Sequence, residues 1–114
     1  MSEDRITISP AEGTWVVRAG GAVIGESGRA LVLREEGHDP VTYFPREDIA
    51  MAFLDASDTR TTCPFKGEAS YFSIVTRSTT LHDAAWSYED PKDAVSAIRG
   101  HLAFYPDEIA VEQV

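Results

Sequence analysis

Short runs of β-branched and aromatic residues, separated by glycines and prolines, constrain the fold of this 114-residue chain more than any other feature. Trp15–Ala19 and Ala22–Gly25 flank the pair Gly20–Gly21, which fits a tight hairpin because such turns need positive φ. Further runs are Ala30–Leu33, Val41–Phe44, Ala69–Val75, Ala84–Tyr88, Leu102–Tyr105 and Ile109–Val111. This spacing predicts a mostly β fold: small antiparallel sheets, two packed together or one that curls on itself.

Helical signals are confined to two places. Pro45 and the acidic residues after it predict one helical turn over 45–49. The clearer signal lies between Asp90 and Gly100, where Asp90 is a good N-cap, Pro91 suits the first helical position and Gly100 suits the C-terminal end. We therefore expect one short helix near residues 90–100. Ala52–Leu54 is a candidate for a brief strand.

The charge of the chain argues against some classes of partner. Nineteen acidic and ten basic residues give a formal net charge of −9, and the basic residues are scattered. Nucleic-acid binding gains affinity from Lys and Arg contacts to phosphate, so we expect neither nucleic acid nor an anionic membrane as a partner. No linker, signal peptide or membrane-length apolar run is visible. These features predict one cytoplasmic domain spanning 1–114, as a monomer or homodimer.

Cys63 is the single cysteine, so it forms no disulfide within the chain. The other soft metal donors are His38, His82 and His101, and no two of the four have zinc-ligand spacing, so we expect no metal and no cofactor. A nucleophilic Cys63 with His82 and Asp83 is one interpretation. The other is a structural thiol that reacts slowly, because lone cysteines usually behave as small buried hydrophobes and Cys63 has apolar neighbours.

The stretch from Lys66 to Tyr88 contains the strongest candidate site. Tyr71 lies on one face of its predicted strand, while Trp86 and Tyr88 are two residues apart and share a face of the partner strand. If these faces coincide, the three rings form an aromatic wall with Lys66 at its edge. The alternative is that they are core or cross-strand packing. With Lys66 at the surface, Lys66→Ala should change stability by less than about 0.5 kcal/mol.

Acidic residues also occur as adjacent pairs, Glu35–Glu36 and Glu89–Asp90. Neighbouring side chains on a strand point to opposite faces, so neither pair is an acid–base dyad. We interpret both pairs as solvated turn or cap residues.

Four blocks of sequence resemble the bacterial family called domain of unknown function 427, in order and over nearly the whole chain. They are Tyr43–Asp48, Thr62–Tyr71, Asp83–Pro91 and Ala103–Asp107. The resemblance implies a β-tent-like fold, in which two antiparallel sheets meet along a ridge beside a short helix. Relatives of that architecture hold zinc between paired-cysteine knuckles, which this chain lacks, or bind a small ligand in an aromatic cage, to which Trp86 would correspond.

The family is also labelled as a nucleotidyltransferase. The chain has none of the paired acids on a strand after a Gly-Ser turn that such metal-dependent chemistry uses, so the sequence argues against that activity.

Three functions remain. The favoured one is a module that binds a small molecule, anionic or carbonyl-bearing, through Lys66, Tyr71, Trp86, Tyr88, Tyr43, Tyr105 and Cys63. The second is an enzyme with Cys63 or Lys66 as nucleophile and Asp48 or His82 as proton carrier. The third is an interaction domain with an exposed sheet edge. Aromatic and cationic groups without a convincing acid–base pair favour binding over catalysis.

Overall fold

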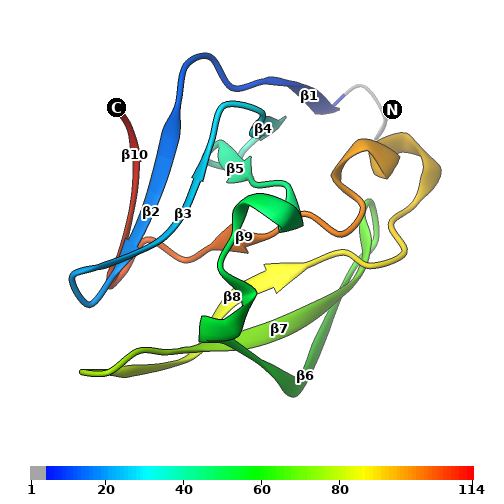
Figure 1. Ribbon diagram of the computed structural model, residues 1–114. Coiled ribbons are helices and arrows are strands. Elements are labelled where there is room, and N and C mark those ends of the chain that lie inside the picture. Colours follow the sequence, from blue (N-terminus) through cyan, green and yellow to red (C-terminus); the bar gives the residue numbers. More distant parts are fainter. Residues whose placement is uncertain (1–4) are drawn as a thin grey trace.

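A computed structural model describes residues 5–114 of the chain (Figure 1). Short strands account for most of it, with brief 3-10 turns between them. The strands are β1 (Ile6–Pro10), β2 (Trp15–Ala19), β3 (Ala22–Ser27), β4 (Leu31–Glu35), β5 (Val41–Tyr43), β6 (Leu54–Cys63), β7 (Gly67–Val75), β8 (Thr80–Ser87), β9 (Ala103–Phe104) and β10 (Ile109–Gln113). The 3-10 turns are η2 (Arg46–Asp48), η3 (Met51–Phe53) and η4 (Asp93–Ile98).

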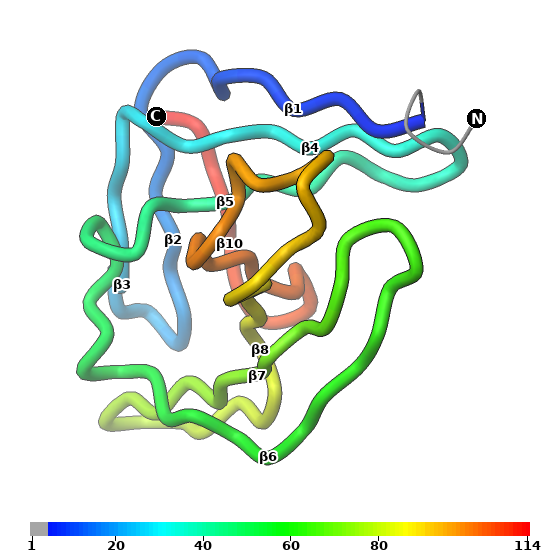
Figure 2. The backbone as a smooth tube through the Cα atoms, turned by 90° about the vertical axis from the view of Figure 1, so that its right-hand side faces the viewer, coloured from blue at the N-terminus to red at the C-terminus, as the bar shows by residue number. Residues whose placement is uncertain are grey.

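Within the described residues these strands form three antiparallel sheets, in the orders β1-β4-β5, β10-β2-β3 and β6-β7-β8-β9. The predicted mostly antiparallel β class is confirmed, with three small sheets where one or two were expected. A bridge between Phe44 and Leu102 joins the end of β5 to the start of β9, and so connects the first sheet to the third. In both views β6 lies at the opposite end of the molecule from β1 (Figures 1 and 2).

Local turn signals predicted the hairpins well. Gly20 and Gly21 have φ of +56° and +84° and join β2 to β3, as two glycines in a tight turn should. The strands β7 and β8 form the second predicted hairpin. The loop between these strands is short, because Thr76 donates its backbone N–H to Thr79 O at 2.9 Å and β8 begins at Thr80, ahead of the predicted run Ala84–Tyr88.

The predicted helix near 90–100 is a pair of 3-10 turns, since Val95 has non-helical φ and ψ of −123° and 26°. Lys92, not Asp90, occupies the N-cap, and the Asp90 carboxylate instead pairs with Arg99 at 3.2 Å. The backbone of this segment is held from outside: Lys92 N–H donates to Lys66 O at 2.9 Å, and Gly100 N–H donates to Tyr88 O at 3.0 Å. These backbone hydrogen bonds to residues outside the segment favour a conformation other than a regular helix.

Two strands carried no usable sequence signal. Of these, β1 has only two strongly apolar residues, Ile6 and Ile8, and ends at Pro10. Strand β6 is polar and largely exposed, so it lacks the alternation that marks a half-buried strand. The brief strand expected at Ala52–Leu54 is mostly the turn η3, and only Leu54 belongs to β6. The helical turn expected over 45–49 is present as η2.

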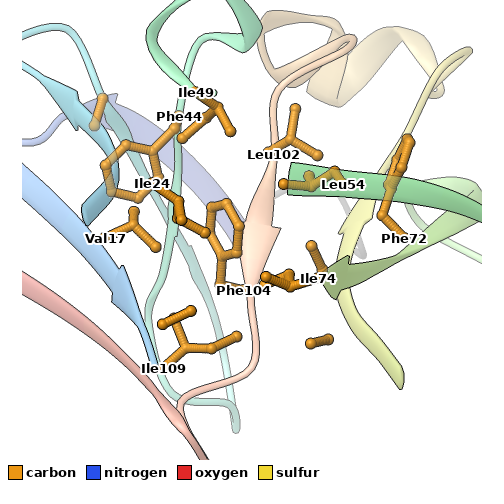
Figure 3. Close-up of a cluster of buried hydrophobic side chains, with 14 of the residues drawn as sticks. Val17, Ile24, Phe44, Ile49, Leu54, Phe72, Ile74, Leu102, Phe104 and Ile109 are labelled. Atoms are coloured by element: carbon orange, nitrogen blue, oxygen red, sulfur yellow. The ribbon is translucent and has the colours of Figure 1, made fainter. Parts of the chain in front are cut away.

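The interior has two apolar clusters. The larger lies between the sheets, with Val17 and Ile24 on one side, Leu54 and Phe72 on the other and Phe104 between them (Figure 3). The second cluster packs the 3-10 segment against β4, β5, β7 and β9, and consists of Leu33, Tyr43, Ala69, Tyr71, Tyr88, Val95, Ile98 and Ala103. This second cluster is the floor of the candidate site. None of the helical segments described is long and apolar enough to cross a membrane.

Candidate functional site

The hairpin β7–β8 brings the predicted aromatic residues to one face. Tyr71 pairs directly with Trp86 across the two strands, so their side chains share a face. Phe72, the next residue along, belongs to the other cluster. Tyr88 follows the end of β8 and packs in the same cluster as Tyr71. The common face inferred from the two-residue period of the strands is therefore present.

Five rings gather on this face. Trp86 stands edge-on to Tyr43, with ring centroids 6.4 Å apart, and lies 4.5 Å from the centroid of Tyr105. Tyr105 is stacked on Tyr71 at 6.5 Å and an interplanar angle of 10°. The indole Nε1 of Trp86 donates to the Tyr43 hydroxyl at 3.3 Å. Tyr88 completes the group, which we call the aromatic cluster.

A cavity of about 540 Å³ lies against the aromatic cluster. Its other walls come from the β4–β5 hairpin and from the turn between β6 and β7, two segments whose ends project to the same side of the molecule (Figure 2). The seven candidate residues from the sequence all line it: Tyr43, Cys63, Lys66, Tyr71, Trp86, Tyr88 and Tyr105. The lining residues that sequence reasoning missed include Arg5, Leu33, Glu35, His38, Val41 and Phe65.

Lys66 is not a surface charge. Its Nζ lies 2.7 Å from Oε1 of Glu35, at the end of β4, and the two side chains are only 12% and 9% exposed. The expectation that Glu35 is a solvated turn residue is therefore wrong. Glu36 does follow that expectation, since it is exposed. The Lys66–Glu35 ion pair joins the β6–β7 turn to the first sheet across the cavity wall.

The ion pair sets the charge states of both partners. Burial alone would raise the pKa of Glu35, but the hydrogen bond and the charge of Lys66 outweigh burial and hold this pKa below its ordinary 4.5. Burial alone would lower the pKa of Lys66, but Glu35, together with the nearby Cys63 thiol, raises it above 10.5. Lys66 therefore stays an ammonium at neutral pH, whereas a nucleophilic lysine needs a lowered pKa.

Three phenols of the cluster have raised pKa values and stay protonated. Burial raises the pKa of both Tyr43 and Tyr88 above the ordinary 10.0. Burial and the neighbouring Tyr71 hydroxyl raise the pKa of Tyr105 to about 12. Tyr71 also shares a 2.8 Å hydrogen bond with Thr61. Tyr43, Tyr88 and Tyr105 are therefore neutral hydrogen-bonding side chains over the physiological pH range.

Tyr88 differs from the other phenols. Its side chain belongs to a residue only 6% exposed, and within residues 5–114 no hydrogen bond joins its hydroxyl to another residue. The hydroxyl is also not sealed in, because the one fully buried unpartnered side-chain oxygen in the described residues is that of Ser87. Since Tyr88 lines the cavity, its hydroxyl is free to bond to what enters.

The proposed proton carriers do not reach this cavity. Asp48 accepts a 2.6 Å hydrogen bond from Ser27 and pairs with Arg29 at 3.3 Å. His82 and Asp83 line a different hollow of about 490 Å³, where Asp83 accepts a 2.7 Å bond from Thr59. The structure therefore does not assemble Cys63 with His82 and Asp83. Within the described range no three His, Cys, Asp or Glu side chains gather so as to hold a metal ion.

Cys63 is half-buried and pairs with Gly67 at the end of the β6–β7 hairpin. Its place beside Lys66 follows from the turn, because Lys66 N–H donates back to Cys63 O at 3.3 Å. Phe65, in the same turn, lies under the Arg5 guanidinium, whose central carbon is 5.0 Å from the ring centroid. The turn thus places the Cys63 thiol, the Lys66 ammonium and the Phe65 ring beneath Arg5 around the cavity.

A comparison with protein families agrees with the resemblance noted in the sequence. The family model described as a domain of unknown function, DUF427, matches residues 7–114. A search of curated proteins found no match. Since the matched range covers nearly the whole chain, this protein belongs to the domain of unknown function 427 family.

Proposed function

We propose that this chain is a small-molecule binding module and that its ligand occupies the cavity beside the aromatic cluster. One observation carries the proposal: seven residues singled out from four separate stretches of sequence line a single cavity of about 540 Å³. That volume lies within the range of roughly 300–1,000 Å³ typical of ligand pockets. The lining also has their usual character, with aromatic walls and a few convergent polar groups.

Two features favour binding over catalysis. Asp48 and His82, the two proton carriers expected from the sequence, do not line the cavity. The ammonium of Lys66 is held by Glu35 and is not available as a free amine. Among residues 5–114 no specific contact favours the enzyme or the interaction domain. The cytoplasmic location, the single-domain organisation and the monomeric or homodimeric state stay predictions.

The two tryptophans of the chain permit a direct test. Trp15 lies outside the cavity, in β2, and donates its Nε1–H to Glu12 O at 2.9 Å. In Trp15→Phe, Trp86 is the single fluorophore of its kind and reports on the cavity. We expect that at least one member of a library of small aromatic metabolites changes the Trp86 emission saturably and raises the melting temperature, since a ligand that binds only the folded state stabilises it.

Trp86→Phe is the matched control, because it keeps Trp15 as the only tryptophan. The same compounds should leave the emission of that variant unchanged and should raise its melting temperature less. A library that changes neither emission nor melting temperature of Trp15→Phe would contradict the proposed function. A compound that changes Trp15 emission alone would place binding elsewhere.

A further inference from the structure

We propose, building on the binding function above, that the cavity selects an electrically neutral ligand and holds a carbonyl-class oxygen of that ligand on the Tyr88 hydroxyl. Three observations lead to this assignment: the internal ion pair, the unpartnered hydroxyl and the aromatic walls.

The ion pair argues against a charged ligand. Lys66 and Glu35 are the charged side chains that line the inner wall, they are 2.7 Å apart, and their charges cancel. A ligand carboxylate next to Lys66 would also lie next to the Glu35 carboxylate, and a ligand ammonium next to Glu35 would lie next to Lys66. Either arrangement adds like-charge repulsion in a partly desolvated site. A neutral dipole meets no such penalty.

The Arg5, His38 and Asp39 side chains complete the titratable lining, and we call them the rim. Arg5 is already engaged, since its guanidinium covers the Phe65 ring and donates to Glu36 O at 3.4 Å. Asp39 is exposed, so water screens its charge, and His38 is also exposed. The rim residues therefore do not change the preference for a neutral ligand that the Lys66–Glu35 pair creates.

The Tyr88 hydroxyl supplies a donor that the protein does not use. Because no other described residue bonds to this hydroxyl, a ligand acceptor can accept its hydrogen bond without displacing an internal one. The proton is available over the physiological range because burial raises the pKa of Tyr88. By contrast, the Tyr71 hydroxyl is already bonded to Thr61. The acceptor that fits a neutral ligand is an amide or ketone oxygen.

The walls specify the remainder of the ligand. Trp86 and Tyr105, with centroids 4.5 Å apart, and the stacked Tyr71 present ring faces and edges. Planar rings pack well against such surfaces. The inferred ligand class is therefore a neutral planar ring that bears a carbonyl group.

Three planar probes of nearly equal shape separate the charge states at pH 7: benzamide is neutral, benzoate is an anion and benzamidine is a cation. Their titration into ¹⁵N-labelled wild-type protein, followed by amide chemical shifts, gives three dissociation constants. We expect benzamide to bind at least about tenfold more tightly than either charged probe, a difference that corresponds to about 1.4 kcal/mol.

Tyr88→Phe tests the assigned hydroxyl. This substitution removes no hydrogen bond to the described residues, so the fold should be retained. Benzamide binding should weaken about three- to tenfold, the effect of one hydrogen bond. Tyr71→Phe is the matched control, because it removes a hydroxyl of the same cavity that already has a partner, and it should leave benzamide affinity unchanged. Equal weakening in both variants would overturn the assignment to Tyr88.

Glu35→Gln tests the charge argument independently. The amide keeps an oxygen for Lys66 but removes the negative charge, so the cavity becomes cationic. Benzoate should then bind more tightly than benzamide, a reversal of the wild-type order. The inference is overturned if a charged probe binds wild type as tightly as benzamide, if the order does not reverse, or if no probe gives a saturable response. The proposed function itself fails only if, in addition, no compound of the fluorescence library changes the Trp86 emission or the melting temperature of Trp15→Phe.

Discussion

Replacing Phe44 with alanine should lower the free energy of unfolding by about 3–5 kcal/mol, the usual cost of deleting a buried phenylalanine ring. Phe44 is completely buried, and its ring packs edge-on against Phe104 with centroids 6.0 Å apart. Its backbone exchanges two hydrogen bonds with Leu102, at 2.8 and 2.9 Å, where the first sheet joins the third. The cavity left by the ring would therefore lie at the junction of two sheets. Urea unfolding, with the midpoint and slope both fitted, measures the change.

Phe53→Ala is the control of equal chemistry. Phe53 is only partly buried at the edge of the same cluster, so its truncation should cost clearly less. Equal losses in the two variants would contradict the view that the Phe44–Leu102 junction holds the sheets together. A loss in Phe44→Ala below about 1 kcal/mol would do the same, since such values are typical of sites that lose little packing.

Those parts of the fold that depend on neighbours in sequence could be predicted. The glycine pair Gly20–Gly21 demanded a turn, because both positions need positive φ, and the runs on either side could only continue as paired strands. The same local logic placed β7 beside β8 and put Tyr71 and Trp86 on one face. In each instance the determining residues lie within about twenty positions of one another.

The parts that depend on distant partners could not be predicted. Strand β6 exists because β7 offers it a ladder of backbone hydrogen bonds, and its own polar residues show no burial pattern. The Asp90 signal for a helix N-cap was overridden because the segment is tied to Lys66 and Tyr88 through its backbone. Local propensity loses to tertiary contacts of this kind.

The candidate site shows the same division. Turn chemistry at Gly67 and strand alternation were sufficient to bring Lys66 toward the aromatic cluster. Glu35 was misjudged because its partner lies 31 positions away and the contact depends on how the first sheet sits on the β6–β7 turn. The charge of the cavity follows from that one contact. Lys66 considered alone suggests an anionic ligand, whereas the Lys66–Glu35 ion pair suggests a neutral one.

Lys66→Ala should therefore destabilise the protein by about 3 kcal/mol at pH 7, the lower end of the range for breaking a buried ion pair. The loss arises mainly from Glu35, whose carboxylate is 9% exposed in the wild type and would lose its counter-charge. This value is well above the change of about 0.5 kcal/mol expected of a surface lysine. Equilibrium urea unfolding of the variant and the wild type measures the difference.

The pH dependence of that difference identifies its cause. In the wild type the pKa of Glu35 lies below 4.5, so its contribution is present above pH 4.5 and is lost as the pH falls through the folded-state value. The pKa of Lys66 lies above 10.5, so its contribution is present below pH 10.5 and is lost as the pH rises through the folded-state value. The difference in the free energy of unfolding between wild type and Lys66→Ala should be largest between these two pH limits. It should become smaller in acid, where Glu35 is protonated in both proteins.

The double variant Lys66→Met with Glu35→Leu is the decisive control. It removes both charges and fills similar volume, and such replacements of buried pairs are often neutral or stabilising. It should recover most of the stability that Lys66→Ala loses, and a double-mutant cycle then gives the coupling between the two side chains. A small, pH-independent effect of Lys66→Ala would mean that the pair is open in solution. Lys66 would then be a free cation, and the cavity should prefer benzoate over benzamide even in the wild type.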